Sequence, residues 1–229
     1  MTDFKELEKK IGITFKNKSF LEEALTHRSY LNENPSWKRD KNERLEFLGD
    51  AVLELVVTEH LFKTYPDTEE GTLTVMRAAV VNTKSLYEVA IEVGFDKALL
   101  LSKGEAKDVN SRGRETISAN SVEAVIGAIY LDQGYKQAKK FIDKYITPKL
   151  DNIAEDGGKD PKSLVQEIAQ AKYKITPSYE VLGESGPAHD RIFIVGLYFG
   201  EELKMKGEGS SKQEAELNAA SHLLKFLED

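Results

Sequence analysis

The sequence predicts two domains: an all-α domain over residues 1–150, and a small α+β domain over residues 160–229 with the element order α-β-β-β-α. Two observations support this division. Apolar residues recur at the helical spacing through most of the first region, whereas the second contains three short segments that alternate with the strand period. Residues 151–159, which lie between the two regions, are polar and contain the pair Gly157-Gly158, which is typical of a flexible linker.

The first domain is predicted to be a succession of helices. Ser19 and Glu22 have the spacing of a capping box, which would begin a helix through FLEEALTHRSYL. A long helix is expected from about Asn42 to Thr64, because apolar residues follow the helical spacing there and Pro66 comes soon after. Further helices are expected at about 69–80, 82–93, 117–132 and 135–146, and the polar segment 103–115 is expected to be an exposed loop.

The second domain is predicted to place a three-stranded sheet between two helices. A helix is expected over residues 161–172, and strands are expected in SYEVLGESG, RIFIVGLYFG and EELKMKGEG. Ser211 and Glu214 repeat the capping-box spacing and would begin a final helix through EAELNAASHLLKFL.

The composition limits the kinds of site that the chain can build. It has no cysteine, which excludes disulfides and thiolate metal sites, and its four histidines are scattered. Any metal is therefore expected to be a hard cation on carboxylates, Mg²⁺ first, with Mn²⁺ able to substitute. The polar first residues and the lack of a long apolar run predict a cytoplasmic protein with no membrane partner. The net charge of −7 argues against nucleic-acid binding, although metal-binding carboxylates would account for part of it.

Acidic residues on two apolar helices form the most specific pattern in the sequence. Glu43, Glu46 and Asp50 fall within roughly 60° of one another on the long helix, and they would repel one another without a positive charge among them. Such a face is often simply solvated, but the surrounding stretch LEFLGDAVLELVV is almost entirely apolar, which favours inward-facing acids that need a partner. Asn120 and Glu123 lie three residues apart on a second apolar helix, so the two helices could form one metal site.

The segments around these acids resemble one family along nearly the whole chain. NERLEFLGDAVL at residues 42–53 closely resembles the ribonuclease III signature, and ALTHRSY, GTLTVMRAAVVN and SVEAVIGAIYLD resemble the segments around it. PKSLVQEIAQ, PSYEVLGESGPAHDRIFIV and GEGSSKQEAELNAA resemble a double-stranded RNA-binding domain. The resemblance implies a helical ribonuclease III endonuclease fold and a homodimer whose two sites each cut one strand of double-stranded RNA. It also implies products with 5′-phosphates and short 3′ overhangs, and a role in processing ribosomal and other RNA.

The resemblance assigns roles to individual acids. Asp50 and Glu123 match catalytic acids, and with Glu46 they match metal ligands, whereas Glu43 and Glu70 match subsidiary acids in the same cleft. The fourth metal-ligand position is normally aspartate but is Asn120 here, whose amide oxygen can bind Mg²⁺ without contributing negative charge. Three explanations stay open: an engineered inactivating substitution, a natural variant that still cleaves, or a naturally inactive RNA-binding member.

In the second domain the resemblance implies contacts with two minor grooves of the RNA and with the phosphates between them. The phosphate contacts fall at the start of the last helix, where free N–H groups and a lysine favour an anion. Without the resemblance, His189 is better explained as an ordinary loop residue, and Ser211 acts as a helix cap in any case. The residues implied are Gln166, Gln170, His189, Ser210, Ser211 and Lys212.

Two functions of different kinds follow from the sequence. We favour a metal-dependent endoribonuclease, and Asn120 keeps open a double-stranded RNA-binding protein that does not cleave. A di-iron protein is a weaker interpretation, because such sites pair Glu with a His three residues later, and that spacing does not occur on these helices. Arg112 and Arg114 are explained equally well as RNA contacts or as surface charges.

Overall fold

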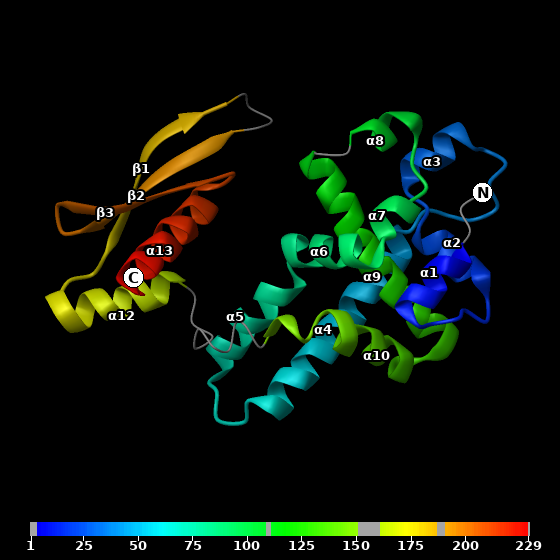
Figure 1. Ribbon diagram of the computed structural model, residues 1–229, viewed down its shortest axis with the longest axis horizontal. Coiled ribbons are helices and arrows are strands. Elements are labelled where there is room, and N and C mark those ends of the chain that lie inside the picture. The colour runs from blue at the N-terminus through cyan, green and yellow to red at the C-terminus, as the bar shows by residue number, and fades with distance from the viewer. Residues whose placement is uncertain (1–3, 109–110, 151–160, 187–190, 229) are drawn as a thin grey trace. The chain divides into compact units, whose positions relative to one another are not determined.

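The computed structural model describes residues 4–108, 111–150, 161–186 and 191–228. The chain divides into two compact units, Met1–Gly158 and Lys159–Asp229, each with its own hydrophobic core (Figure 1). The first unit is helical and the second is α+β, which confirms the predicted fold class. The predicted linker, residues 151–159, lies outside the described residues. No helix within the described ranges is long and apolar enough to cross a membrane.

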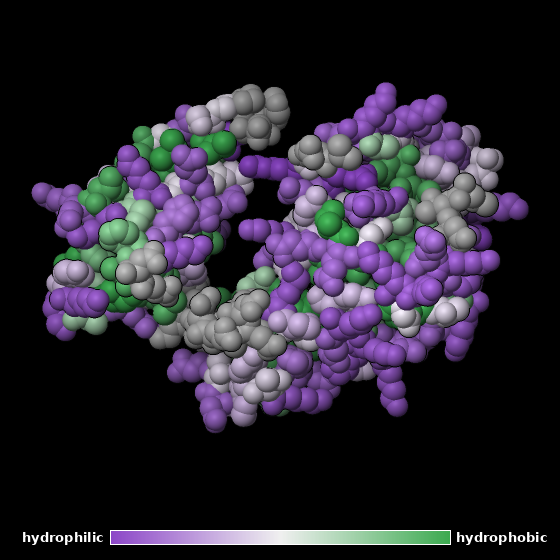
Figure 2. Space-filling model, in the orientation of Figure 1, coloured by the Kyte–Doolittle hydropathy of each residue, from purple (hydrophilic) through white to green (hydrophobic). Residues whose placement is uncertain are grey.

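The first unit is built around α9, whose middle part is buried on most of its sides. Helices α2, α4, α6 and α10 pack around it. On the face shown in Figure 2, hydrophilic residues dominate the surface of this unit, as expected when the apolar side chains are in the core. The described helices are α1 (Phe4–Ile11), α2 (Lys18–Ala24), α3 (Arg28–Glu33), α4 (Glu43–Thr64), α5 (Glu70–Val81), α6 (Thr83–Val93), α7 (Phe95–Ala98), α8 (Lys103–Lys107), α9 (Arg112–Gln133) and α10 (Tyr135–Tyr145).

The predicted helix through FLEEALTHRSYL is in fact two helices, α2 and α3. Thr26 interrupts it, because this residue pairs with Leu100 in an isolated parallel bridge. His27 then caps α3 by accepting a hydrogen bond from the Ser29 N–H. The predicted capping residue was also wrong: Asn17, not Ser19, caps α2.

The segment 103–115, which the sequence predicts to be an exposed loop, is partly helical. It contains α8 and the first turn of α9. Ser102 caps α8 and Ser111 caps α9, each by accepting a backbone hydrogen bond at its side-chain oxygen. Two serines therefore allow short helical turns in a stretch whose polar composition indicated a loop.

Helices α4 and α9 cross with their backbones in contact. A Cβ atom on Gly49 would lie 1.7 Å from the carbonyl oxygen of Glu123, and one on Gly127 would lie 2.3 Å from the carbonyl oxygen of Leu45. Only a residue without a side chain leaves room for this approach. The crossing therefore sets Glu46, the residue after Leu45, beside the turn of α9 that contains Glu123.

The second unit packs two helices against an antiparallel sheet of order β1-β2-β3. Its core joins Val165 and Ala169 of the first helix to Leu197 of the central strand and Ala219 of the last helix. Gly207 lets the last helix approach the sheet, because a Cβ there would lie 2.2 Å from the carbonyl oxygen of Ala215. The elements are α12 (Pro161–Tyr173), β1 (Ser178–Ser185), β2 (Ile192–Phe199), β3 (Glu202–Gly209) and α13 (Lys212–Glu228).

We expect Gly49→Ala to destabilise the first unit by about 1–3 kcal/mol, because the added methyl group forces two backbones apart. Gly71→Ala is the matched control, since Gly71 also lies in a helix but its Cβ would meet no atom within 4 Å. Alanine there should leave stability unchanged or raise it by up to about 1 kcal/mol. Trp37 is the sole tryptophan and lies in the first unit, so its fluorescence during urea unfolding measures both variants. Equal midpoints would contradict the tight crossing.

Candidate active site

Side chains from α4 and α9 converge where these two helices cross. Glu46 and Glu123 are half-buried, and Asp50 is exposed. The half-buried Asn120 donates a hydrogen bond from Nδ2 to Glu46 Oε1 over 2.8 Å. Asp50 follows Glu46 by about one turn, and Glu123 follows Asn120 by three residues, so each helix contributes two oxygen-bearing side chains to one place.

Burial and neighbouring acids destabilise the charged forms of Glu46 and Glu123. The pKa of Glu123 is raised to about 8, chiefly by burial and further by the charges of Asp50 and Glu46. Burial also raises the pKa of Glu46; the hydrogen bond from Asn120 opposes this rise, while the charges of Glu43 and Asp50 reinforce it. The site therefore holds surplus negative charge, which a bound cation would offset.

The donor atoms fit a hard divalent cation by their chemistry. Carboxylate and amide oxygens are ligands that Mg²⁺ and Mn²⁺ accept. Among the described residues, however, no group of three or more His, Cys, Asp or Glu side chains is arranged to hold a metal ion without moving. The Asn120 amide holds Glu46 Oε1 through a hydrogen bond that an ionised aspartate could not donate, so a cation bound at that oxygen would compete with Asn120.

The other acids of α4 behave differently from the inward-facing arrangement that the sequence predicted. Glu43 is half-buried and pairs with Lys41 over 2.5 Å, although its charge still reaches Glu46. Asp50 faces solvent, because the buried face of α4 is the one that carries Leu45 and Gly49. The inward-facing prediction was therefore wrong for Asp50.

Glu70 lies apart from this cluster within a single copy of the chain. Helices α4 and α5 run antiparallel, because Arg77 on α5 contacts Glu54 at 2.8 Å and Thr58 at 3.1 Å on α4. Glu70, at the start of α5, is therefore beside the C-terminal end of α4. Figure 1 shows α4 and α5 as neighbouring helices. Glu46 lies 18 residues before that end, or about 27 Å along the helix axis.

A hollow of about 250 Å³ opens beside Glu46, between the starts of α3, α4 and α9. The start of α4 is fixed there by Asn42, whose N–H donates to the Thr26 carbonyl over 2.9 Å and whose Nδ2 donates to the Ala24 carbonyl over 3.3 Å. His27 and Arg28 were not predicted as site residues, although both belong to the segment ALTHRSY. The lining residues are His27, Arg28, Asn42, Glu43, Glu46, Thr116, Ile117 and Asn120.

The two arginines near the start of α9 differ. Arg114 donates a hydrogen bond from Nη2 to the carbonyl oxygen of Asp96, so it ties α9 to α7 and is not a free surface charge. Arg112 is exposed. A structural role therefore accounts for Arg114, whereas Arg112 stays available for a partner.

The predicted RNA contacts of the second unit lie on α12 and at the start of α13. Gln166 and Gln170 are exposed and four residues apart, which places them on one face of α12. Ser211 Oγ accepts a hydrogen bond from the Glu214 N–H over 3.1 Å, as a helix cap does. The second half of the predicted capping box was wrong: the Glu214 carboxylate accepts from the Ser210 N–H over 2.6 Å, not from Ser211. His189 lies outside the described residues.

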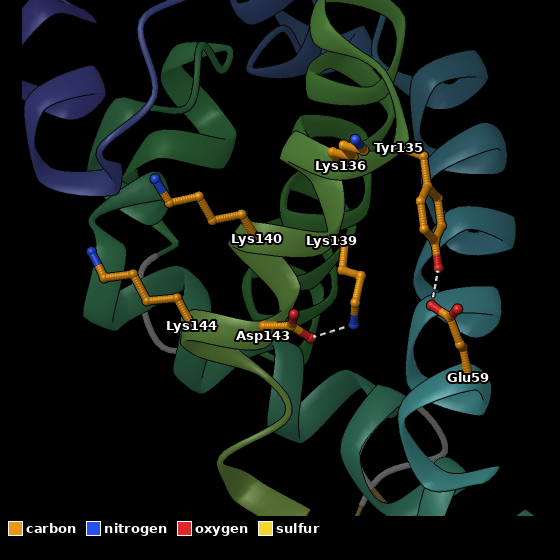
Figure 3. Close-up of a pocket in the computed structure, with 7 residues that line it drawn as sticks. All are labelled: Glu59, Tyr135, Lys136, Lys139, Lys140, Asp143 and Lys144. Carbon is orange, nitrogen blue, oxygen red and sulfur yellow. Dashed lines mark hydrogen bonds and ion pairs between the residues drawn. The ribbon is translucent and has the colours of Figure 1, made fainter. Parts of the chain in front are cut away.

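A larger hollow of about 650 Å³ lies between α4 and α10 (Figure 3). Four of the residues that line it form two bonded pairs, and the other three are Lys136, Lys140 and Lys144. The Tyr135 hydroxyl donates to Glu59 Oε2 over 2.5 Å, and Lys139 pairs with Asp143 over 3.0 Å. The lining of this hollow has more lysines than acids, so it lacks the surplus negative charge of the α4–α9 crossing, which therefore remains the candidate for a metal site.

Comparisons with known proteins agree for both units. The model of the family "Ribonuclease-III-like" matches residues 17–150, and the model of the double-stranded RNA binding motif matches residues 161–227. A Ribonuclease 3 from Enterococcus faecalis is 46% identical over 222 residues, which cover 97% of this chain and 96% of its own. A Ribonuclease 3 from Borreliella afzelii is 44% identical over 228 residues, which cover 98% of this chain and 91% of that protein. The solved nuclease domain of ribonuclease III from Campylobacter jejuni is 40% identical with a TM-score of 0.57, and the match covers 63% of this chain and 96% of that one.

We expect the metal-free protein to lose stability as the pH rises from about 4.5 to about 8, the interval between the ordinary pKa of Glu123 and its raised value. In this interval the folded state keeps a proton that the unfolded chain releases, so a rising pH favours unfolding. Glu123→Gln should flatten this dependence and unfold later than the native chain at pH 8. The exposed Glu115, also on α9, gives the control variant Glu115→Gln. Unfolding midpoints in EDTA across pH provide the measurement, and identical profiles for native and Glu123→Gln proteins would refute the raised pKa.

Proposed function

The chain belongs to the ribonuclease III family, and from this membership we propose that it hydrolyses double-stranded RNA with Mg²⁺ held by Glu46, Asp50, Asn120 and Glu123. Membership makes it an endoribonuclease of the ribonuclease III type with a double-stranded RNA-binding domain. The observation that carries the metal site is the meeting of Glu46 and Glu123 from two helices, where burial and the charges of neighbouring acids raise both pKa values.

The proposed division of labour follows from exposure and charge. Bound Mg²⁺ would neutralise the phosphate and supply a nucleophilic water. Asp50 is the exposed acid and would face the solvent side from which RNA approaches, while the half-buried Glu123 and Glu46 would hold the cation. The proposed products carry 5′-phosphates and short 3′ overhangs. We assign the activity to processing of ribosomal and other RNA in the cytoplasm, with Mn²⁺ able to replace Mg²⁺.

We further propose that Asn120 impairs cleavage. An amide removes one negative charge from the cation site, and its N–H group ties up an oxygen of Glu46. A cation must therefore compete with an internal hydrogen bond and gains less electrostatic attraction than it would beside aspartate.

In the second unit, we propose that the RNA is bound by Gln166 and Gln170 on α12, by His189, and by Ser210, Ser211 and Lys212 at the start of α13. The exposed glutamines on one face of α12 support a minor-groove contact, and the N-terminus of α13 supports a phosphate contact.

Cleavage of a long RNA duplex in Mg²⁺ tests the proposed function. We expect Asn120→Asp to cleave about 10- to 100-fold faster than the native chain, the range usual for a disturbed metal site. The double variant Asn120→Asp with Glu123→Gln is the control, and it should not cleave. If native chain and Asn120→Asp both bind duplex RNA but neither cleaves it, the protein is the non-cleaving RNA-binding protein that is our second candidate.

An apolar stripe on α4 supports the proposal that the first unit dimerises. Phe47, Leu55 and Phe62 lie on one side of α4 and are 80%, 57% and 74% exposed. Large apolar side chains in such a row mark an interaction surface. The C. jejuni relative is described as having a region involved in dimer formation of its nuclease domain. We therefore propose that two copies pair along this stripe.

A two-fold axis near the middle of the stripe would also explain Glu70. In a symmetric interface each contact occurs twice, so the C-terminal end of α4 in one copy meets the N-terminal end in the other. Glu70 lies beside the C-terminal end, and the acids Glu43 and Glu46 lie at the N-terminal end. We propose that the Glu70 of each copy serves the cleft of the other.

Leu55→Lys is expected to convert the dimer to a monomer, because two buried ammonium groups would face each other near the axis. Ile91→Lys is the control: Ile91 is 45% exposed on α6, outside the stripe, and its replacement should leave the dimer intact. Sedimentation equilibrium measures both variants. A Leu55→Lys protein that stays dimeric would rule out pairing along this face of α4.

A further inference from the structure

Three lysines form a row on α10. Lys136, Lys140 and Lys144 follow one another at four-residue intervals, and all three are exposed. Successive members are about 6 Å apart along the helix axis. Figure 3 shows Lys140 and Lys144 extending to the same side of α10, away from Glu59 and Tyr135. We call these three residues the lysine stripe.

The charge of the lysine stripe is not neutralised. Within the described part of the chain, none of its three members forms an ion pair. The nearby acids already have partners, since Asp143 pairs with Lys139 over 3.0 Å and Glu59 pairs with Lys63 over 2.6 Å. The stripe is therefore a concentration of free positive charge on a chain whose net charge is −7.

We propose that the lysine stripe binds the sugar-phosphate backbone of the RNA at a distance from the cleavage centre. The inference rests on the proposed function, which supplies a polyanionic substrate. Lysine ammonium groups bind phosphates as point charges, and a regular row of them suits a regular row of phosphates without selecting a sequence. Most of the binding free energy of such contacts comes from release of condensed counterions, so it depends steeply on salt.

The stripe is separate from the candidate active site. Glu59 is hydrogen-bonded to Tyr135 at the start of α10, and it follows Glu46 by 13 residues on α4, which is about 20 Å along the axis. Within one copy of the chain, a duplex must therefore extend well beyond the acids to reach the lysines. The stripe should therefore matter for long RNA and not for short RNA.

The test measures RNA affinity against salt concentration for two triple variants. One is Lys136→Gln, Lys140→Gln and Lys144→Gln; the other is Lys9→Gln, Lys84→Gln and Lys97→Gln, which removes the same charge from exposed lysines scattered over other helices. Fluorescence anisotropy in EDTA follows binding without cleavage. The slope of log K against log salt is negative, and its magnitude should decrease by about one for each phosphate that is no longer neutralised. We therefore expect a decrease of about two to three in the stripe variant and none in the control.

Four other outcomes distinguish the explanations. Equal slopes for the two triple variants would overturn the inference. It would also be overturned if the stripe variant changed the slope for a duplex of about 16 base pairs, the span of one RNA-binding domain, as much as for a long duplex. If polyglutamate binds the native chain but not the stripe variant while RNA slopes stay equal, the surface serves an acidic protein and the inference is wrong. If the native chain binds no duplex RNA, the proposed function is wrong, and the inference that rests on it is wrong as well. Should the triple variant unfold, Lys140→Gln alone must still lower the magnitude of the slope by about one.

Discussion

The backbone contact between α4 and α9 is the constraint on which the first unit depends. Gly49 and Gly127 remove the side chains that would hold the helices apart. Because both helices are rigid and buried around this point, their acids are held in place by the core rather than by loops. Asn42 adds a second restraint, since its backbone and side chain both tie the start of α4 to the segment before α3. Packing thus determines where the oxygen atoms of the site can be.

The same contact has an electrostatic cost. Glu46 and Glu123 cannot move apart without breaking the core, so their charges are offset only by protonation, by hydrogen bonds or by a cation. Asn120 donates one hydrogen bond to Glu46 and adds no charge, which reduces the electrostatic repulsion in the metal-free protein. An aspartate at that position would increase the repulsion before a cation bound and the attraction once it had. In the proposed metal site, the residue at position 120 would therefore shift the balance between stability without the cation and affinity for it.

Much of this architecture could be predicted because hydrophobic spacing is local. The long helices and the α-β-β-β-α order follow directly from it, and so does the expectation that Glu43, Glu46 and Asp50 lie on one helix. Helix starts were harder, because Asn17 and Ser19 compete for one cap and Glu214 has two neighbouring N–H groups to choose from. The exposure of Asp50 depends on which face of α4 meets α9. The position of Glu70 depends on the direction of α5, which residue spacing does not contain.

The turn before α13 already holds an anion of its own. The Glu214 carboxylate accepts hydrogen bonds from the backbone and hydroxyl groups of Ser210, beside the N–H groups that would receive an RNA phosphate. A tethered carboxylate is present at high effective concentration, so a single free anion competes with it poorly. If RNA binds at this turn as proposed, a duplex that is held at several other points would displace Glu214 more readily than a single free anion does. The turn would then favour a long RNA over mononucleotides and inorganic phosphate.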